Sequence, residues 1–229
     1  MEKITILLAE DHKVVRQGIR QLLEREEGFK VIGEASDGEE TVELAKQLKP
    51  DVIIMDIAMP KLNGIEATKQ IKQLPLCTIV LILTAYDYEE YIFPILEAGA
   101  AGYLLKDVSG NELIDAIRTV YKGESVLHPV VARKLIEQFK GASIKYGREQ
   151  ALALLTERET EVLKMAARGM SNKEIANELF LSVHTIESHF GGIFNKLGVC
   201  SRIEAVMEAF KRGWFTLADI SQPDSSSGG

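Results

Sequence analysis

Apolar runs alternate with helical patterns through the first half of the chain. The apolar runs are short, and the segments between them carry apolar residues at helical spacing. This pattern predicts five buried strands, at residues 4–9, 30–35, 51–55, 79–84 and 102–105. It predicts five helices, at about residues 13–26, 38–48, 64–74, 91–98 and 109–122. Such an order is typical of an α/β domain with a doubly wound, five-stranded parallel sheet.

The second half of the chain has a helical pattern throughout residues 152–218. Helix starts are marked by three Ser/Thr-x-x-Glu capping boxes and one further N-cap: Thr156 with Glu159, Ser171 with Glu174, Ser201 with Glu204, and Ser182. With helix stops at Gly169 and Gly198, these signals predict helices at about residues 157–168, 172–179, 183–197 and 202–212. Only residues 180–182 separate the second and third helices. The spacing predicts a small all-α helix-turn-helix domain, with a generic helical hairpin as the alternative.

The length of 229 residues suits two modest domains. We predict a first domain at residues 1–123, a linker at 124–151 with a helix at about 129–140, a second domain at 152–218 and a flexible tail at 219–229. No apolar run approaches the ~20 residues of a membrane span, and the N-terminus has no signal-peptide pattern. We therefore expect a cytoplasmic protein without a membrane partner.

Charge is distributed unevenly along the chain. Residues 1–125 hold 14 basic and 22 acidic residues, a net charge of −8. Residues 126–150 hold 5 and 2, a net charge of +3, and residues 151–229 hold 8 and 10, a net charge of −2. A strongly basic second half would by itself indicate nucleic-acid binding, and this half does not. We interpret the basic joint as a solvated linker, with contact to the acidic first domain or to a phosphate backbone as alternatives.

Polar residues suited to phosphoryl chemistry lie at the ends of four predicted strands. Glu10 and Asp11 follow the first strand and Asp56 follows the third. Thr84 ends the fourth strand and Lys106 follows the fifth. The carboxyl ends of parallel strands meet at one edge of the sheet, where open α/β sheets bind ligands. We therefore expect three carboxylates, a hydroxyl and an ammonium group to converge there.

These side chains match the needs of phosphoryl transfer. An Asp carboxylate can attack phosphorus, and the reaction otherwise needs positioning and charge neutralisation. The carboxylates can hold or orient Mg²⁺, while Lys106 and Thr84 can contact phosphoryl oxygens. Any one residue alone is explained more simply as a helix N-cap or a solvated strand end, but their shared location favours a site. A stand-alone phosphatase is a weaker alternative, because the carboxylate that would hold phosphate is itself the acceptor.

Four motifs occur in the order and at the spacing of a known family. They are Leu8-Ala9-Glu10-Asp11-His12, Ile53-Ile54-Met55-Asp56-Ile57-Ala58-Met59-Pro60, Leu83-Thr84-Ala85 and Gly102-Tyr103-Leu104-Leu105-Lys106-Asp107. Over about residues 3–123 the chain resembles the receiver domain of two-component response regulators. The resemblance implies a flavodoxin-like fold.

The same resemblance implies roles for individual residues. Asp56 is implied to accept a phosphoryl group from a phosphohistidine on a sensor histidine kinase. Mg²⁺ is implied to be held by Asp11, Asp56 and the backbone carbonyl of Ala58, with Glu10 assisting. A receiver of this kind assists only its own phosphorylation and dephosphorylation, so we do not expect an enzyme that acts on other substrates.

Two positions bear on how a signal would leave the receiver. Thr84 and Tyr103 match the family's switch pair, in which Thr84 moves toward the phosphoryl group and Tyr103 repacks behind it. A core aromatic is the alternative for Tyr103.

The chain departs from the family at Pro94, which falls inside the predicted fourth helix. Proline there removes a backbone donor and costs ~3 kcal/mol, so we expect that helix to start late or to kink near Phe93.

The second half carries its own resemblance. The motifs Leu155-Thr156-Glu157-Arg158-Glu159, Ser171-Asn172-Lys173-Glu174-Ile175-Ala176, Thr185-Ile186-Glu187-Ser188-His189 and Lys196-Leu197-Gly198-Val199 look like the LuxR-type DNA-binding domain. With a receiver ahead of it, the architecture is similar to the NarL/FixJ family of transcriptional regulators. The resemblance implies that residues 183–197 form a recognition helix for the major groove and that the last helix is available for dimerisation.

DNA contacts are expected on and around the recognition helix, from Lys173, Ser182, His184, Thr185, Glu187, Ser188, His189 and Lys196. Further candidate phosphate contacts are Arg158, Arg168, Arg202 and the cations of residues 133–148. The helix is unusually acidic for this role, because Glu187 stands where the family usually presents Lys or another polar side chain, and Gly191 and Gly192 remove side chains. Phosphate contacts supply most non-specific affinity for DNA, and residues 151–229 have a net charge of −2. An isolated monomer should therefore bind DNA weakly. Glu187 could instead accept a hydrogen bond from a cytosine amino group.

The sequence therefore predicts a phosphorylation-controlled transcriptional regulator of a two-component system. Phosphorylation of Asp56 is expected to favour a homodimer that binds promoter DNA. The alternative keeps the phosphorylation switch but makes the second domain a protein-interaction module that does not bind DNA. The acidic recognition helix supports this alternative.

Overall fold

The structure is a computed structural model that describes residues 3–85, 89–124, 126–127 and 154–214. The chain divides into two compact units, Met1–Ala132 and Arg133–Gly229. The helix predicted at 129–140 and the tail predicted at 219–229 lie outside the described residues. No helix within the described ranges is long and apolar enough to cross a membrane.

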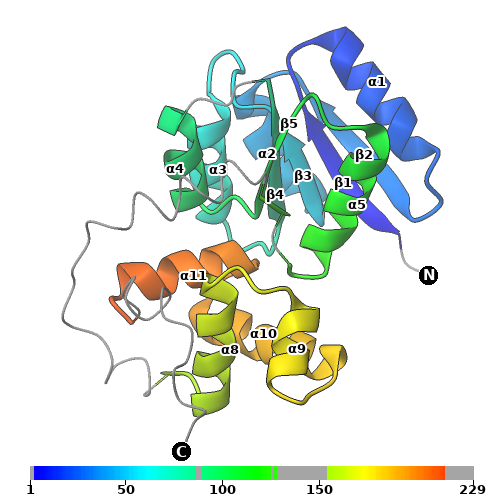
Figure 1. The fold of residues 1–229 in the computed structure, drawn as a ribbon. Helices are drawn as coiled ribbons and strands as arrows, with labels where there is room; N and C mark the ends of the chain where they lie inside the picture. Colours follow the sequence, from blue (N-terminus) through cyan, green and yellow to red (C-terminus); the bar gives the residue numbers. More distant parts are fainter. Residues whose placement is uncertain (1–2, 86–88, 125, 128–153, 215–229) are drawn as a thin grey trace, which may run out of the picture. The chain divides into compact units, whose positions relative to one another are not determined.

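The first unit is built around a parallel sheet with strand order β2-β1-β3-β4-β5-β6 (Figure 1). Its strands are β1 (Ile4–Ala9), β2 (Phe29–Ala35), β3 (Val52–Met55), β4 (Ile79–Thr84), β5 (Gly102–Leu105) and β6 (Val126–Leu127). Its helices are α1 (Lys13–Glu24), α2 (Gly38–Leu48), α3 (Gly64–Lys72), α4 (Glu89–Glu97) and α5 (Gly110–Tyr121). All five predicted strands and all five predicted helices are confirmed.

The two-residue strand β6 was not predicted, because it is too short to show an alternating pattern and lies in the segment assigned to the linker. It pairs with β5 in parallel, with Val126 opposite Gly102. A Cβ on Gly102 would lie 2.8 Å from the Val126 carbonyl oxygen, so glycine permits this close approach of the two backbones.

Helices cover both faces of the sheet. Figure 1 shows α1 and α5 on one side and α2, α3 and α4 on the other. On the α1/α5 side, alternate strand residues such as Ile6 and Leu8 join Leu23 of α1 and Ile117 of α5 in one buried cluster. Burial on both faces explains why the strands are apolar runs and not alternating patterns. The central strands β3 and β4 are buried along their whole length, so the polar residues of the site follow the strands or end them.

Helix α4 runs from Glu89 through Pro94 to Glu97. The expected late start was wrong, since the helix begins before the proline; the kink near Phe93 stays a prediction. The side chains of Ile92, Ile95 and Leu96 are almost completely buried. Their burial offsets the missing backbone donor of Pro94, whose carbonyl still accepts a hydrogen bond from the Ala98 amide at 2.9 Å.

The second unit contains α8 (Glu157–Ala167), α9 (Asn172–Glu178), α10 (Val183–Leu197) and α11 (Arg202–Lys211), which confirms the four predicted helices. Thr156 and Ser171 each begin a complete capping box, and the Ser182 and Ser201 side chains accept backbone bonds as N-caps. At Ser201 the reciprocal bond differs, because the Glu204 carboxylate accepts from the amide of Cys200, the preceding residue, at 3.5 Å. Gly198 ends α10 with a φ of 69°, a left-handed conformation that glycine adopts without strain.

A buried cation holds the helix-turn-helix together. The Arg202 guanidinium donates to the Met170 carbonyl at 2.6 Å and to the Asn172 side chain, and lies 4.4 Å from the centre of the Phe190 ring. Arg202 was considered a candidate phosphate contact, and this was wrong because the residue is buried. Its role is to join the start of α11 to the start of α9 and to α10.

Candidate functional site

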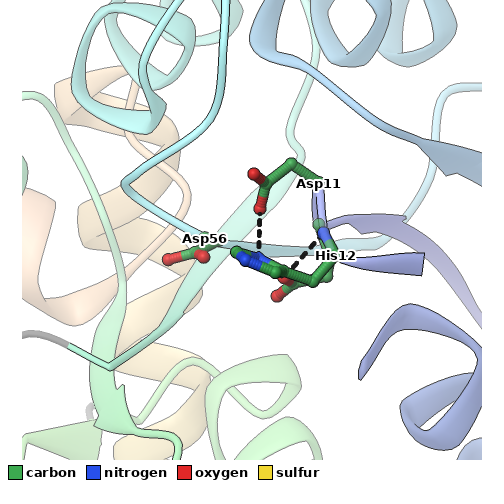
Figure 2. A group of neighbouring side chains, drawn as sticks. Asp11, His12 and Asp56 are labelled. Carbon is green, nitrogen blue, oxygen red and sulfur yellow. Dashed lines mark hydrogen bonds and ion pairs between the residues drawn. The ribbon is translucent and has the colours of Figure 1, made fainter. Parts of the chain in front are cut away.

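The polar residues predicted at the strand ends come together at one edge of the sheet. Glu10 and Asp11 follow β1, Asp56 follows β3 and Lys106 follows β5. Figure 2 shows Asp11, His12 and Asp56 at this edge. One ligand atom each from Glu10, Asp11, His12 and Asp56 lies within 4.8 Å of all the others. Strand order alone explains the convergence, since β1, β3, β4 and β5 are consecutive in the sheet.

Lys106 neutralises two buried carboxylates. Its Nζ lies 2.6 Å from Oδ2 of Asp56 and 2.7 Å from Oε2 of Glu10. Asp56 and Glu10 expose 4% and 2% of their side chains. Burial acts to lower the pKa of Lys106, but the hydrogen bonds to Asp56 and Glu10 outweigh it and raise this pKa above its ordinary value. Lys106 therefore stays charged, as a buried carboxylate pair requires.

Asp56 has one oxygen held by the backbone and one held by the cation. Its Oδ1 accepts a hydrogen bond from the Ile57 amide at 2.7 Å, while its Oδ2 accepts from Lys106. The start of α3 packs directly behind it, since a Cβ on Gly64 would lie 2.4 Å from the Asp56 carbonyl oxygen. The carboxylate is thus fixed in orientation, which a nucleophile for phosphoryl transfer needs.

The donor set fits a hard divalent cation. Oδ1 of Asp11 is buried and lies 2.7 Å from Nδ1 of His12. A divalent cation would offset the negative charge that the neighbouring carboxylates of Glu10, Asp11 and Asp56 share. The carboxylates of Glu10, Asp11 and Asp56 supply the oxygen ligands that Mg²⁺ prefers. Ala58 is exposed beside them, and the role of its carbonyl stays a prediction.

An arginine supports the strand end that carries the acidic residues. The Arg16 guanidinium donates to the Glu10 carbonyl and, at 3.4 Å, to the Asp11 carbonyl. The same side chain bonds Oε2 of Glu34 at 3.3 Å. Neither Arg16 nor His12 was singled out from the sequence. The signal for both was their position in the first turn after the acidic pair, at the start of α1.

Thr84 and Tyr103 are both fully buried. Thr84 ends β4, and its carbonyl accepts from the Lys106 amide at 2.8 Å, which places it next to the site. Tyr103 lies in β5 opposite Ile82 of β4. Burial is compatible with a switch pair and also with a core aromatic, so both interpretations of Tyr103 stay open.

The candidate DNA-binding residues differ in their exposure and in their hydrogen-bond partners. Ser182 and Thr185 are joined by a hydroxyl–hydroxyl bond of 2.8 Å at the N-cap of α10, and Ser188 donates to the His184 carbonyl at 3.0 Å. His184 is 89% exposed, and its Nδ1 lies 3.6 Å from Oε2 of Glu187, which is 39% exposed. Lys173 is exposed on α9, whereas His189 is half-buried.

Lys196 is held against α8. Its Nζ lies 2.6 Å from Oε2 of Glu159, whose carboxylate also bonds Thr156 in the capping box. Burial acts to raise the pKa of Glu159, but the bonds from Lys196 and Thr156 outweigh it and lower this pKa. Gly192 makes room, because a Cβ there would lie 2.8 Å from Oε1 of Glu159. Within α10 the single Lys or Arg is therefore neutralised by an acidic partner.

Both halves of the chain match known families. Residues 6–118 match the response regulator receiver domain, and residues 153–209 match the bacterial regulatory proteins of the luxR family. The chain therefore belongs to the response regulators that join a receiver domain to a LuxR-type DNA-binding domain. This confirms the resemblance predicted from the motifs.

Individual relatives are similar over almost the whole length. Transcriptional regulatory proteins YxjL and LiaR of Bacillus subtilis are each 42% identical to this chain, over 93% and 91% of it and over 97% of each relative. Among solved structures, response regulator ChrA of a heme-sensing two-component system is 35% identical, with a TM-score of 0.51 over 94% of this chain and 100% of that chain. RcsB of Salmonella typhimurium is 29% identical, with a TM-score of 0.55 over 90% and 97%.

Proposed function

We propose that this response regulator is switched by phosphorylation of Asp56 by a sensor histidine kinase. The observation that carries the proposal is the fixed, buried Asp56 carboxylate, which lies 2.6 Å from the Lys106 ammonium beside two further carboxylates. An Asp56 oxygen would form a bond to phosphorus while the bond between phosphorus and the kinase histidine nitrogen breaks. The imidazole leaves with that electron pair and takes a proton from solvent.

Charge explains the surroundings of Asp56. A phosphoryl group adds about −1.5 to −2 charges, and Glu10 and Asp11 are already acidic. Lys106 offsets part of this charge. Mg²⁺, held by Asp11, Asp56 and the Ala58 carbonyl with Glu10 assisting, would supply the rest when bound.

Thr84 and Tyr103 would carry the signal away from Asp56. Thr84 is buried at the end of the adjacent strand and has a hydroxyl that can donate to a phosphoryl oxygen. Its movement would leave a space behind it that Tyr103 fills, because a close-packed core does not keep a void. The resulting change on the receiver surface would favour a homodimer.

We propose that the second domain of the dimer binds promoter DNA through α10 and its surroundings. Lys173, Ser182, His184, Thr185, Glu187, Ser188, His189 and Lys196 are the proposed contacts. Half-sites on a duplex are read by paired domains, so dimerisation multiplies the weak affinity of an acidic monomer. The LuxR-type family membership supports DNA as the partner.

A specific observation favours the second candidate, a protein-interaction module. In α10, Glu187 is partly exposed and Lys196 is paired with Glu159. A surface of this charge repels phosphates and suits a partner with basic groups. The two candidates share the receiver switch and differ only in what the second domain binds.

One experiment tests the switch and a second tests the output. A small phosphodonor should label the native chain, and Asp56→Asn should abolish labelling. Asp107→Asn serves as the control, because it removes an exposed carboxylate next to Lys106. Stoichiometric labelling of the Asp56→Asn variant would overturn the assignment.

The output is tested by DNA selection. Phosphorylated full-length protein should select duplexes from a randomised pool with salt-dependent affinity. Selection of no duplex would favour the protein-interaction module.

A further inference from the structure

The short connection between α9 and α10 carries an exposed aromatic residue (Figure 1). Phe180 in this connection is 95% exposed, more than any other large hydrophobic residue that the structure describes. Val183, the first residue of α10, is 40% exposed. An apolar surface therefore lies directly before the helix proposed to contact DNA, and burial in the core explains neither side chain.

The backbone at Phe180 has a conformation that favours glycine. The Phe180 amide donates to the Asn177 carbonyl at 3.3 Å. The next amide, that of Leu181, donates to the Ala176 carbonyl at 2.9 Å. These two bonds form a Schellman motif, in which the residue after the C-cap is left-handed and is usually glycine. Phe180 takes up this conformation with a φ of 55°, which strains a bulky residue.

Other left-handed positions of the second unit do hold glycine. Among its described residues, positive φ values occur at Phe180 and at three glycines, Gly169, Gly198 and Gly213. Glycine at position 180 would make the same turn without strain. Neither the turn nor the core therefore requires an aromatic ring here. Strained residues of this kind are typical of sites that contact a ligand.

The surroundings of Phe180 favour DNA as that ligand. The residue lies inside the LuxR-type DNA-binding domain and two positions before Ser182, the N-cap of α10 and a proposed DNA contact. Residues 174–195 hold three carboxylates and no Lys or Arg, so this segment cannot gain affinity by pairing cations with phosphates. Apolar side chains, Phe among them, contact the C5-methyl group of thymine in the major groove.

We propose that the Phe180 ring contacts a thymine methyl group in the major groove that α10 enters. The contact adds a preference for sequence that does not depend on charge, which suits an acidic recognition helix. Burial of the ring against DNA offsets the strain of its backbone. The inference rests on the proposed function, in which the second domain binds promoter DNA.

The test uses phosphorylated full-length protein and a duplex that it selects from a randomised pool. Each thymine of this duplex is replaced in turn by uracil, which lacks the C5-methyl group. The native chain should lose affinity roughly fourfold at one position or more, as expected for one buried methyl group. Phe180→Gly should bind the thymine duplex roughly 10-fold more weakly and should no longer distinguish thymine from uracil there. Its salt dependence should equal that of the native chain, because no charge changes.

Two further variants separate loss of the ring from damage to the turn. Phe180→Asn also tolerates the left-handed conformation and should show the same loss, without the added backbone freedom of glycine. Neither variant should lower the unfolding temperature. Leu154→Ala, which removes another exposed apolar side chain of the second unit, is the matched control and should bind as the native chain does.

The outcomes distinguish this inference from the proposed function. Native-like affinity of Phe180→Gly would overturn the inference and would leave the ring free for a protein partner. So would a native chain that distinguishes thymine from uracil at no position of the selected duplex. If the native chain selects no duplex at all, DNA binding by the second domain fails, and this inference fails with it.

Discussion

The ammonium of Lys196 lies 2.6 Å from the carboxylate of Glu159, although 37 positions separate the two residues. The pair joins the last turn of α10 to the first turn of α8, where Glu159 also completes the capping box with Thr156. One carboxylate thereby stabilises a helix start and fixes the helix proposed to contact DNA. Lys196, the single Lys or Arg of α10, is therefore already paired within the fold.

Acid should weaken the second unit through Glu159. Because the pKa of this carboxyl is lowered in the folded chain, its stabilisation is present above its ordinary value of 4.5 and is lost as pH falls through the folded value. Glu159→Gln should lower the free energy of unfolding by about 1–3 kcal/mol at neutral pH. Below pH 4.5 the stability of the variant should fall less steeply than that of the native chain. Urea unfolding followed by fluorescence of Trp214, the single tryptophan, measures this. Glu161→Gln is the control, because it removes a half-exposed carboxylate of the same helix that pairs with Arg158 and not with Lys196.

The two adjacent glycines of α10 should respond differently to alanine. A Cβ on Gly191 meets nothing within 4 Å, so Gly191→Ala should stabilise the second unit by roughly 0.5–1 kcal/mol through helix propensity. A Cβ on Gly192 would push against the Glu159 carboxylate, so Gly192→Ala should gain less or destabilise. Thermal unfolding of both variants checks the difference. Equal stabilisation would show that Glu159 moves away at no cost.

Replacing Glu187 by lysine distinguishes two roles in DNA binding. If Glu187 acts as a brake, Glu187→Lys should tighten binding to every duplex and steepen the salt dependence. If it reads a base, the variant should lose preference at one base pair, worth roughly 1–3 kcal/mol. Glu157→Lys, which changes the net charge equally at the start of α8, is the control. Salt-titrated gel shifts give the answer, and absence of salt-dependent binding by both the native dimer and the Glu187→Lys variant would leave the protein-interaction module.

Signal transfer should need both Lys106 and Thr84. Lys106→Ala leaves Asp56 and Glu10 without their cation, and Thr84→Ala removes a buried hydroxyl next to the site. Both variants should fold but should not dimerise when phosphorylated. Sedimentation with and without a phosphodonor measures this, and Lys122→Ala, an exposed change after α5, is the control. Native-like dimerisation of either variant would show that the signal takes another route.

Most of the first unit could be predicted because buried parallel strands are visible as apolar runs, and their order brings the strand ends together. Lys106, Asp56 and Glu10 converge for this reason alone. The β6 strand was missed because two residues are too few to show a repeating pattern of apolar and polar positions. The late start of α4 was wrong because local propensity at Pro94 was weighed without the burial of Ile95 and Leu96.

Side-chain pairing between helices was beyond the sequence. Capping residues predict where α8 and α10 begin, but not how α10 is rotated about its axis. That rotation decides whether Lys196 contacts Glu159 or solvent. The burial of Arg202 depends on the same packing, since its partners Met170 and Asn172 are about thirty positions away along the chain. The location of the His12 imidazole beside Glu10 and Asp11 depends on the direction of one side chain, which the identities of the neighbouring residues do not specify.

The residues of the acidic pocket are far apart along the chain, which decides when the pocket can form during synthesis. Glu10 and Asp11 leave the ribosome early, Asp56 follows, and Lys106 comes 50 positions after Asp56. A nascent chain that ends before β5 lacks the cation that neutralises Asp56 and Glu10. Its carboxylates repel one another, and β4 has an unpaired edge where β5 belongs. The phosphoacceptor site is thus completed only after most of the receiver has been made, so an unfinished chain does not present a native target to a kinase.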